Sequence, residues 1–200
     1  LSLAESVGAV TPLGALSLEG AAVTFGPNFA ITTAGGSVAM TGAVAAAGAV
    51  TIDTTAGGAA PAGAAIQFAS GFTGGALSLT AGSGGTITLD GAVTVTTPLA
   101  AVTLSDAVLD IGPNVTVATA GGAFSQTGAT VLTAGTAPSA AAIDTAGGTI
   151  GFDGAVDATT AGAQGLALNA GASGIVALQG SIGKMTPLGA LSMTDGLTVI

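Results

Sequence analysis

Apolar and polar residues alternate along much of this chain in short runs. Residues 37–40 read Ser-Val-Ala-Met, residues 86–89 read Thr-Ile-Thr-Leu, and residues 149–152 read Thr-Ile-Gly-Phe. Alternation with a period of two, rich in Val, Ile and Thr, is typical of β-strands with one buried face. Apolar residues do not recur at helical spacing over three turns anywhere, so the pattern predicts an all-β chain with essentially no helix.

The strands belong to a unit of about ten residues that recurs. Residues 84–93 and 147–156 agree at eight of ten positions, and residues 35–44 and 121–128 follow the same plan. The plan is a pair of glycines, an alternating strand, a polar residue followed by Gly, and in most copies a second strand. We expect the Asp-Gly, Thr-Gly and Gln-Gly pairs to form turns in which glycine supplies a positive φ.

A longer repeat is marked by Thr-Pro-Leu followed by an alternating strand. It begins at Thr11, Thr97 and Thr186, which gives offsets of 86 and 89 residues. A long period indicates an array, with long repeats at approximately 11–96 and 97–185 and a partial copy at 186–200. The sequence begins without Met and stops inside a copy, so we interpret residues 1–200 as one continuous window of a longer array, with any targeting signal outside it.

The motif Thr-Ala-Gly-Gly predicts the length of one structural coil. It begins at Thr33 and Thr55, and again at Thr119 and Thr145, and the spacing within each pair gives that length. A sandwich or barrel also has short strands and tight turns, but stacked coils explain better why similar halves follow one another. We therefore predict a parallel β-solenoid (β-helix) of roughly nine coils of about 20–26 residues, with about four coils in each long repeat.

The composition fits a thin interior built from small residues. Hydrophobic residues make up 49% of the chain and charged residues 6%, which favours folding over disorder. The only aromatic residues are six Phe, which we expect to be buried in the coils or at corners. Phe25 and Phe29 flank a Gly-Pro-Asn turn that recurs between Ile111 and Val115, and this exchange with aliphatic residues favours a packing role.

Charge and hydropathy exclude two classes of partner. The net charge is −9 and Lys184 is the only base, whereas nucleic-acid binding needs clustered Lys and Arg. A membrane-spanning helix needs about 20 continuous apolar residues, and polar residues or Pro interrupt every candidate run. We expect neither nucleic-acid binding nor a membrane-spanning segment.

Enzyme chemistry has few suitable side chains here. The chain has no His, Cys or Arg, so the usual acid–base groups, thiol nucleophiles and anion clamps are missing. Some β-helices cleave polysaccharides, but shape alone does not carry that function. We therefore predict a protein that is not an enzyme, with no catalytic residue and no cofactor.

The ten acidic residues are the candidates for metal ligands or catalytic pairs. Asp106 and Asp110 lie four residues apart, as do Asp153 and Asp157. The calcium-binding nonapeptide of β-rolls is matched only out of register by residues 147–153. Neutral residues replace Asp before the turn glycine, so we expect turns on solvated corners and no metal site. That slot holds Asp90, Asp153 or Asp195 in some copies and Thr41, Thr127 or Gln179 in others.

One order of segments resembles a known family. A strand at 149–156, a Leu-Ala-Leu-Asn-Ala-Gly segment within 165–171, a strand at 174–180 and Thr-Pro-Leu at 186–188 follow one another, and a similar order runs from Ile66 to Leu104. This order is similar to repeats of giant bacterial surface proteins, the filamentous haemagglutinin-like adhesins. The chain is poorer in Asn and richer in Ala than that pattern, which weakens any argument from Asn ladders.

The resemblance implies a bacterial extracellular or cell-surface fibre. Such a protein acts as a stalk, filament or matrix component, and its partners are further copies of itself, stacked end to end or side by side, and surface glycans or matrix. The family pattern defines no catalytic residues.

The alternative from a different class is a binding module that presents one flat face to a glycan, a host surface or ice. Residues 86–88 and 94–96 read Thr-x-Thr, as an ice-binding face requires, but the positions matched to Thr88 in other units do not keep Thr. A face that repeats the same exposed polar residues would favour binding, and scattered polar residues would favour a scaffold. The matched positions are Ala39, Ser125, Gly151 and Ala177.

Overall fold

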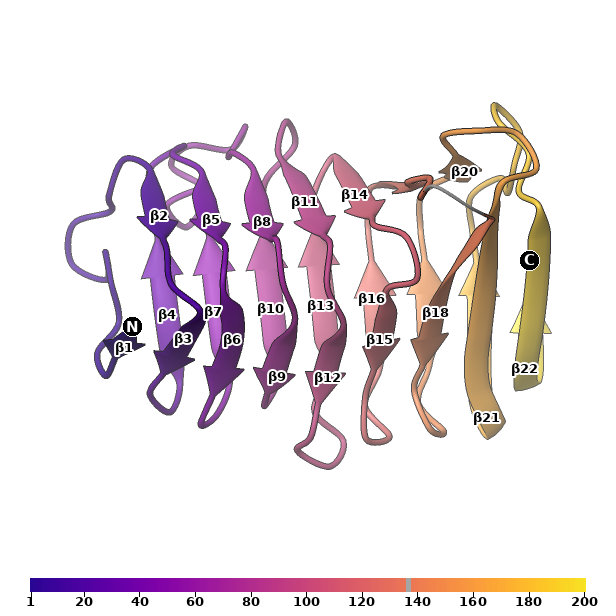
Figure 1. The fold of residues 1–200 in the computed structure, drawn as a ribbon, viewed down its shortest axis with the longest axis horizontal. Coiled ribbons are helices and arrows are strands. Elements are labelled where there is room, and N and C mark those ends of the chain that lie inside the picture. Colours follow the sequence, from indigo (N-terminus) through magenta and orange to yellow (C-terminus); the bar gives the residue numbers. More distant parts are fainter. Residues whose placement is uncertain (136–137) are drawn as a thin grey trace.

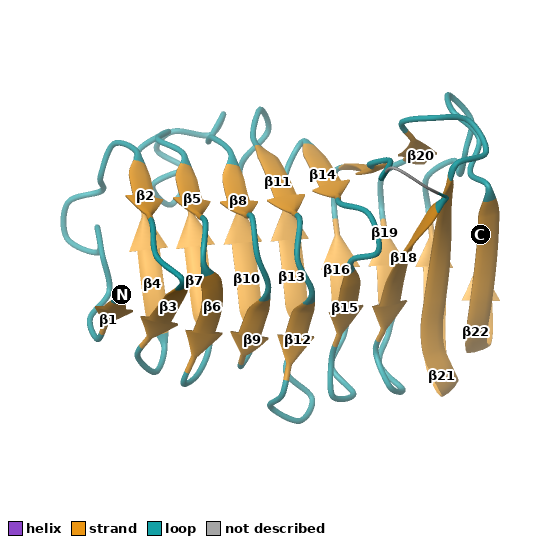
Figure 2. Cartoon of the chain, in the orientation of Figure 1, coloured by secondary structure: helices purple, strands orange, loops and turns teal. Residues whose placement is uncertain are grey.

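The computed structural model describes residues 1–135 and 138–200 as a rod of stacked coils (Figure 1). The described ranges contain strands and loops and no helix, as the alternation predicted (Figure 2). The chain advances steadily along the rod, from β1 at one end to β22 at the other. All paired strands run parallel, in about eight turns. The prediction of a parallel β-solenoid is confirmed, and the turn number is close to the nine coils expected.

Each coil contributes one strand to each of three faces. We name the faces in the order in which the chain visits them. The first face is a seven-stranded sheet of β2 (Leu16–Leu18), β5 (Val38–Met40), β8 (Ile66–Phe68), β11 (Thr86–Leu89), β14 (Val108–Ile111), β17 (Ala129–Leu132) and β20 (Val156–Ala158).

The second and third faces are joined through β21, whose first part pairs with β18 and whose second part pairs with β19. The second face holds β1 (Ser2–Leu3), β3 (Ala22–Phe25), β6 (Ala43–Ala46), β9 (Phe72–Gly74), β12 (Val93–Val95), β15 (Thr116–Ala118), β18 (Ser139–Asp144) and the first parts of β21 (Gln164–Leu178) and β22 (Ala190–Val199). The third face holds β4 (Phe29–Thr32), β7 (Val50–Asp53), β10 (Leu77–Thr80), β13 (Val102–Ser105), β16 (Phe124–Gln126), β19 (Ile150–Phe152) and the second parts of β21 and β22.

The strand register fixes the length of each coil. Val23 pairs with Val44 of the next coil, and Val44 pairs with Phe72 of the coil after that. The first of these steps falls within the predicted range of coil lengths, and the second is slightly longer than that range. The extra residues of the longer coil lie in the loop between β7 and β8, at the corner between the third and first faces.

The long sequence repeat is one strand shorter than four coils. Thr-Pro-Leu precedes β2 on the first face, β13 on the third face and the first part of β22 on the second face. From β2 to β13 is a step of eleven strands, and three strands make a coil. The expected four coils per repeat is therefore wrong: the repeat has three and two-thirds coils. Successive copies of one sequence consequently occupy different faces of the rod.

This rotation is possible because the three faces need the same inward residues. Val38 on the first face and Phe124 on the third occupy equivalent positions in the two repeats, 86 residues apart, and both are fully buried. Burial alternates along nearly every strand, so each buries a similar apolar stripe against the other two faces. The same strand sequence can therefore lie on any of the three faces.

All six Phe side chains are fully buried, which confirms their predicted packing role. Phe25 and Phe29 stack with ring centroids 4.3 Å apart. Phe124 and Phe152 are register neighbours in successive coils, and their centroids lie 5.3 Å apart. The interior is therefore filled by aromatic rings at a few levels and by Val, Ile and Leu at the others.

The turn glycines have a different role from the one predicted. Gly42, Gly128, Gly154 and Gly180 follow Thr, Asp or Gln, yet none has a positive φ. They are glycines because the neighbouring coil lies too close for a side chain: a Cβ on Gly42 would come within 1.9 Å of the Gly20 carbonyl oxygen. The expectation of positive φ at these turns is wrong. Glycine is required there because the corners of neighbouring coils stack closely.

The Thr-Ala-Gly-Gly corners do use positive φ. The first glycine of this motif has φ of 76° at Gly35, 85° at Gly121 and 114° at Gly147. The motif threonine closes the same turn: Thr145 Oγ1 donates a hydrogen bond to the Gly148 carbonyl oxygen at 2.6 Å. Thr33 and Thr119 donate to Gly36 and Gly122 in the same way.

Candidate functional surface

The third face carries the most regular polar surface of the rod. Two rows of outward side chains run across consecutive coils, with in-register pairing along each row. The first row is Thr51, Ser78, Thr103 and Ser125, and the second row is Thr32, Asp53, Thr80 and Ser105. We call these eight residues the hydroxyl array, because seven of them carry a hydroxyl group.

The geometry of parallel strands sets the spacing of the hydroxyl array. Neighbouring strands lie about 4.8 Å apart, and residues two apart on a strand lie about 6.6 Å apart. Thr51 and Thr103 are exposed, and Ser78 between them is half-buried. The array is thus a nearly uncharged grid of hydrogen-bond donors and acceptors. Such a grid can bind a repetitive polar ligand, and it offers no strong nucleophile or acid–base pair.

Asp53 is the single carboxylate of the array, and the adjoining corner holds it. Its Oδ1 accepts hydrogen bonds from the amide and the hydroxyl of Thr55, both at 2.6 Å, and its Oδ2 accepts one from the Gly57 amide at 2.8 Å. Partial burial alone would raise the pKa of Asp53. The bonds from Thr55 and Gly57 outweigh burial and leave the pKa below its ordinary value. Asp53 is therefore an ionised structural acceptor.

The other two faces lack a comparable array among the described residues. On the first face, Ser17, Ala39, Gln67, Thr88, Asp110, Val131 and Asp157 follow one another in register. On the second face, Thr24, Ala45, Thr73, Thr94, Ala118 and Asp144 do so. Hydroxyl groups are interrupted there by Ala and by charged or amide side chains.

Sequence comparison missed the hydroxyl array because it aligned residues from different faces. Thr88 lies on the first face, whereas the aligned Ser125, Gly151 and Ala177 lie on the third. The expectation that Thr88 belongs to no regular threonine row is confirmed, since its register neighbours are Gln67 and Asp110. The signal for the true array is the step of one coil length that separates Thr51 from Ser78 and Ser78 from Thr103.

Two of the three aspartates that precede a turn glycine lie where turn chemistry places them, and the third, Asp195, lies within β22. Asp90 and Asp153 are exposed at corners, as predicted. Asp90 accepts a hydrogen bond from Gln67 Nε2 at 3.3 Å, and Asp153 accepts one from Gln179 Nε2 at 2.9 Å. Within residues 1–135 and 138–200, no three His, Cys, Asp or Glu side chains converge as a metal site would require.

Asp106, between β13 and β14, is buried, unlike Asp90 and Asp153. Its side chain is only 8% exposed, and Gln126, which is fully buried, donates a hydrogen bond from Nε2 to Asp106 Oδ1 at 2.9 Å. Burial raises the pKa of Asp106 to about 6, against opposing hydrogen bonds from Gln126 and the Gly128 backbone. Asp106 is therefore held from the interior by the Gln126 side chain.

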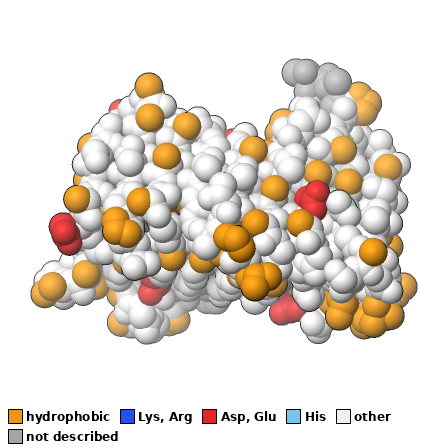
Figure 3. All heavy atoms as spheres, turned by 90° about the horizontal axis from the view of Figure 1, so that it is seen from below, with side chains coloured by type: hydrophobic (Ala, Val, Ile, Leu, Met, Phe, Trp, Pro, Cys, Tyr) orange, Lys and Arg blue, Asp and Glu red, His pale blue; other side chains and the backbone are white. Residues whose placement is uncertain are grey.

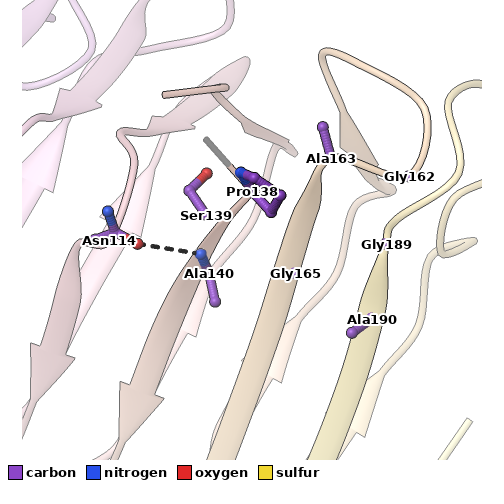
Figure 4. A pocket seen from close by; sticks show the side chains of 9 residues that line it. All are labelled: Asn114, Pro138, Ser139, Ala140, Gly162, Ala163, Gly165, Gly189 and Ala190. Carbon is purple, nitrogen blue, oxygen red and sulfur yellow. Dashed lines mark hydrogen bonds between the residues drawn. The ribbon is translucent and has the colours of Figure 1, made fainter. Parts of the chain in front are cut away.

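A shallow hollow of about 390 Å³ lies on the second face near its corner with the first (Figure 4). Ala140, Gly165 and Ala190 form its floor in three successive coils. Asn114 lies at its rim, with Oδ1 accepting a hydrogen bond from the Ala140 amide at 3.4 Å. The hollow exists because the floor residues are small, and its described lining contains no charged side chain.

The surface as a whole carries few charges. Seen from below, acidic side chains lie singly among small polar and apolar ones (Figure 3).

The part of the chain that the structure describes contains no helix long and apolar enough to cross a membrane. No protein-family model, curated protein or solved structure matches the chain.

Proposed function

We propose that this chain is a structural or adhesive β-solenoid segment of a bacterial fibre outside the cell or on its surface, serving as a stalk, filament or matrix component. The observation that supports it most is the eleven-strand repeat. Because each repeat rotates its sequence by one face, every face receives strands of every type, and copies can be added without a special junction. The resemblance to filamentous haemagglutinin-like repeats favours the same role.

The proposed role involves no catalysis. The fold uses its polar side chains to build corners: Thr33, Thr119 and Thr145 close turns, and Asp53 holds a loop. Between the corners it displays mainly Ala, Gly, Ser and Thr. These side chains suit a uniform rod more than a site with one reacting centre.

Self-association is part of this proposal. The described coils stack on one another through in-register parallel strands, and β22 pairs with β21 in the same way. A parallel strand edge is a template for a further strand of the same kind. We propose that copies of the chain associate end to end by this stacking, or side by side through their faces.

Surface labelling and electron microscopy together test this function. Antibodies against this chain, applied to unpermeabilised cells that produce the native protein, should label the surface or shed fibres, and the isolated protein should form unbranched rods. Labelling only after permeabilisation, combined with compact particles, would overturn the proposal. An antibody against a cytosolic protein controls for cell lysis.

The hydroxyl array favours a second candidate function, namely a binding module for an uncharged polar surface such as a glycan. Thr51→Val and Thr103→Val remove exposed hydroxyls from the array and keep side-chain shape. Thr24→Val and Thr73→Val make the same change on the second face. Weaker binding to a glycan array or to ice in the first pair alone would support this candidate, and equal binding by both pairs would exclude it.

A further inference from the structure

Among the described residues, three buried side-chain oxygens have no hydrogen-bond partner, those of Asp106, Gln126 and Thr130. Asp106 and Gln126 share a hydrogen bond from Nε2 to Oδ1 at 2.9 Å. The remaining oxygen of each, Asp106 Oδ2 and Gln126 Oε1, is buried and accepts no hydrogen bond from the described residues. The hydroxyl oxygen of Thr130, which is also fully buried, likewise has no hydrogen-bond partner among the described residues.

Two acceptor oxygens cannot satisfy each other, and a buried acceptor without a donor destabilises the fold. A single proton on Asp106 Oδ2 removes this conflict, because the protonated oxygen becomes a donor. A carboxylic acid and a primary amide can then form two antiparallel hydrogen bonds. The amide N–H donates to one carboxyl oxygen, which is observed here, and the acid O–H donates to the amide oxygen.

We propose that Asp106 and Gln126 form a buried carboxylic acid–amide pair that binds one proton, carried on Asp106 Oδ2 and donated to Gln126 Oε1. The ligand of this site is therefore a proton. The successive coils that contain β13, β14, β16 and β17 are the part of the rod whose stability responds to proton binding. The pair accounts for both oxygens at once, whereas an ionised Asp106 leaves both without a donor.

The surrounding charges favour the protonated form. The other carboxyls on or next to the strands of these coils and their neighbours are Asp90 after β11, Asp110 on β14, Asp144 on β18, Asp153 after β19 and Asp157 on β20. Each accepts a hydrogen bond, Asp157 from the Met185 and Thr186 amides and the others from a side chain, and each lies nearer the surface than Asp106. These described strands carry no base, so ionised Asp106 would meet only like charges. Burial raises the pKa of Asp106 to about 6, in agreement with this geometry.

The first repeat shows that the site is an addition to the fold. The positions 86 residues before Asp106, Gln126 and Thr130 hold residues without ionisable or amide groups: Gly20, Met40 and Val44. Met40 and Val44 are buried there, as Gln126 and Thr130 are here. The coil geometry therefore works with an apolar interior, and the second repeat has a polar one in its place.

Proton binding sets the sign of the pH effect. A carboxyl whose pKa is raised on folding binds more protons in the folded state, so stability falls as pH rises through that range. The window runs from the ordinary value of 3.8 to about 6. Across this pH window the folding equilibrium constant should fall roughly a hundredfold. Above the window, Asp106 should cause no further change in the equilibrium constant.

The variant Asp106→Asn tests the pair directly. An amide–amide pair retains both hydrogen bonds without a proton, so this variant should lose the fall in stability between about pH 4 and 6 and should be up to roughly a hundredfold more stable at neutral pH. Asp153→Asn is the matched control, because Asp153 also accepts a bond from a Gln Nε2 at 2.9 Å but is exposed. Its pH profile should keep the wild-type slope.

Urea unfolding of the wild type and both variants at a series of pH values gives these profiles. If Asp106→Asn keeps the wild-type slope or is less stable at neutral pH, the proposal is overturned. The infrared spectrum of the folded wild type gives a second test that needs no variant to fold. A protonated carboxyl band at pH 5 supports the pair, and its absence, or a water or cation bridging Oδ2 and Oε1 in a high-resolution structure, overturns it.

Discussion

Gly154 lies directly against Gly128 of the preceding coil: a Cβ atom built on Gly154 would come within 1.9 Å of the Gly128 carbonyl oxygen. The next coil repeats the contact, since a Cβ on Gly180 would come within 2.1 Å of the Gly154 carbonyl oxygen. Three coils therefore touch backbone to backbone at one corner. The glycines in this column permit the strand spacing that the three ladders require.

Gly154→Ala should destabilise the rod, because the new methyl group has to push two backbones apart. Overpacking of this kind costs about 1–3 kcal/mol. Gly14→Ala is the matched control, since a Cβ there has nothing within 4 Å and the residue has no positive φ. Urea unfolding followed by circular dichroism should show a lower midpoint for Gly154→Ala only. Equal midpoints would show that the corner can relax.

Phe124→Ala should cost more stability than any surface change. Phe124 is fully buried and packs against Phe152, so the substitution leaves a cavity between two coils. Loss of a buried Phe costs about 3–5 kcal/mol. Leu99→Ala removes an apolar side chain that is 79% exposed and should change the unfolding free energy little. A small effect of Phe124→Ala would contradict the packed interior.

Thr119→Val should weaken one corner without changing its shape. The buried Thr119 hydroxyl donates to the Gly122 carbonyl oxygen at 2.5 Å, and valine keeps the volume but leaves that oxygen with one donor fewer. The loss should be about 1–2 kcal/mol. Thr103→Val, on the exposed third face, serves as the control and should be nearly neutral. Thermal unfolding of the two variants compares them, and a larger loss in Thr103→Val would contradict the role of the corner hydroxyl.

The strands, the parallel solenoid and the approximate coil length could be predicted, because each leaves a local signal in the sequence. Ile87 and Leu89 alternate with polar residues, and the Thr-Ala-Gly-Gly corners return at about one coil length. The number of coils in the long repeat, three and two-thirds and not four, leaves no local signal in the sequence. The spacing of the corners fits three and two-thirds coils as well as four, and only the strand register decides between them.

The buried proton site and the hydroxyl array could not be predicted for a related reason. Both depend on which residues lie next to each other in neighbouring coils, and a repeat that rotates by one face places equivalent residues in different surroundings. The sequence pattern relates Asp106 only to Asp110, four residues away, and Gln126 at the position of Met40 is a signal that the interior is polar there. Thr51 and Thr103 belong to different parts of the repeat, so an alignment of the repeats does not compare them.

Asp53→Asn should remove part of the loss of stability in acid. Partial burial opposes ionisation of Asp53, but hydrogen bonds from Thr55 and Gly57 to the carboxylate leave its pKa lowered in the folded state. Such a group adds stability above its unfolded value, and that stability is lost as pH falls through the folded value. The effect thus lies below about pH 4, on the acid side of the Asp106 window.

Urea unfolding between pH 2 and 5 measures this contribution. The wild type should lose stability more steeply than Asp53→Asn as the pH falls. Asp90→Asn changes an exposed carboxyl with a longer hydrogen bond, of 3.3 Å, and should follow the wild-type curve. A wild-type slope in Asp53→Asn would mean that the corner bonds do not depend on ionisation.

Distances between spin labels can test the eleven-strand repeat. Ala100 is equivalent to Gly14 in the sequence repeat, but it precedes β13 on the third face, whereas Gly14 precedes β2 on the first. Ala107 precedes β14 on the first face and occupies the position of Gly14 four whole coils later. The chain has no Cys, so cysteines introduced at these positions are labelled specifically.

The pair Gly14→Cys and Ala107→Cys should be separated by four strand layers along one corner, about 19 Å between backbones. The pair Gly14→Cys and Ala100→Cys is separated by about 18 Å along the axis and also by the width of a face, so its distance should be the longer one. Pulsed electron paramagnetic resonance measures both. If the repeat were four whole coils, the Ala100 label would lie on the same corner as Gly14 and the order of the two distances would not hold. The longer distance for the residue nearer in sequence is therefore the specific mark of a repeat that rotates around the rod.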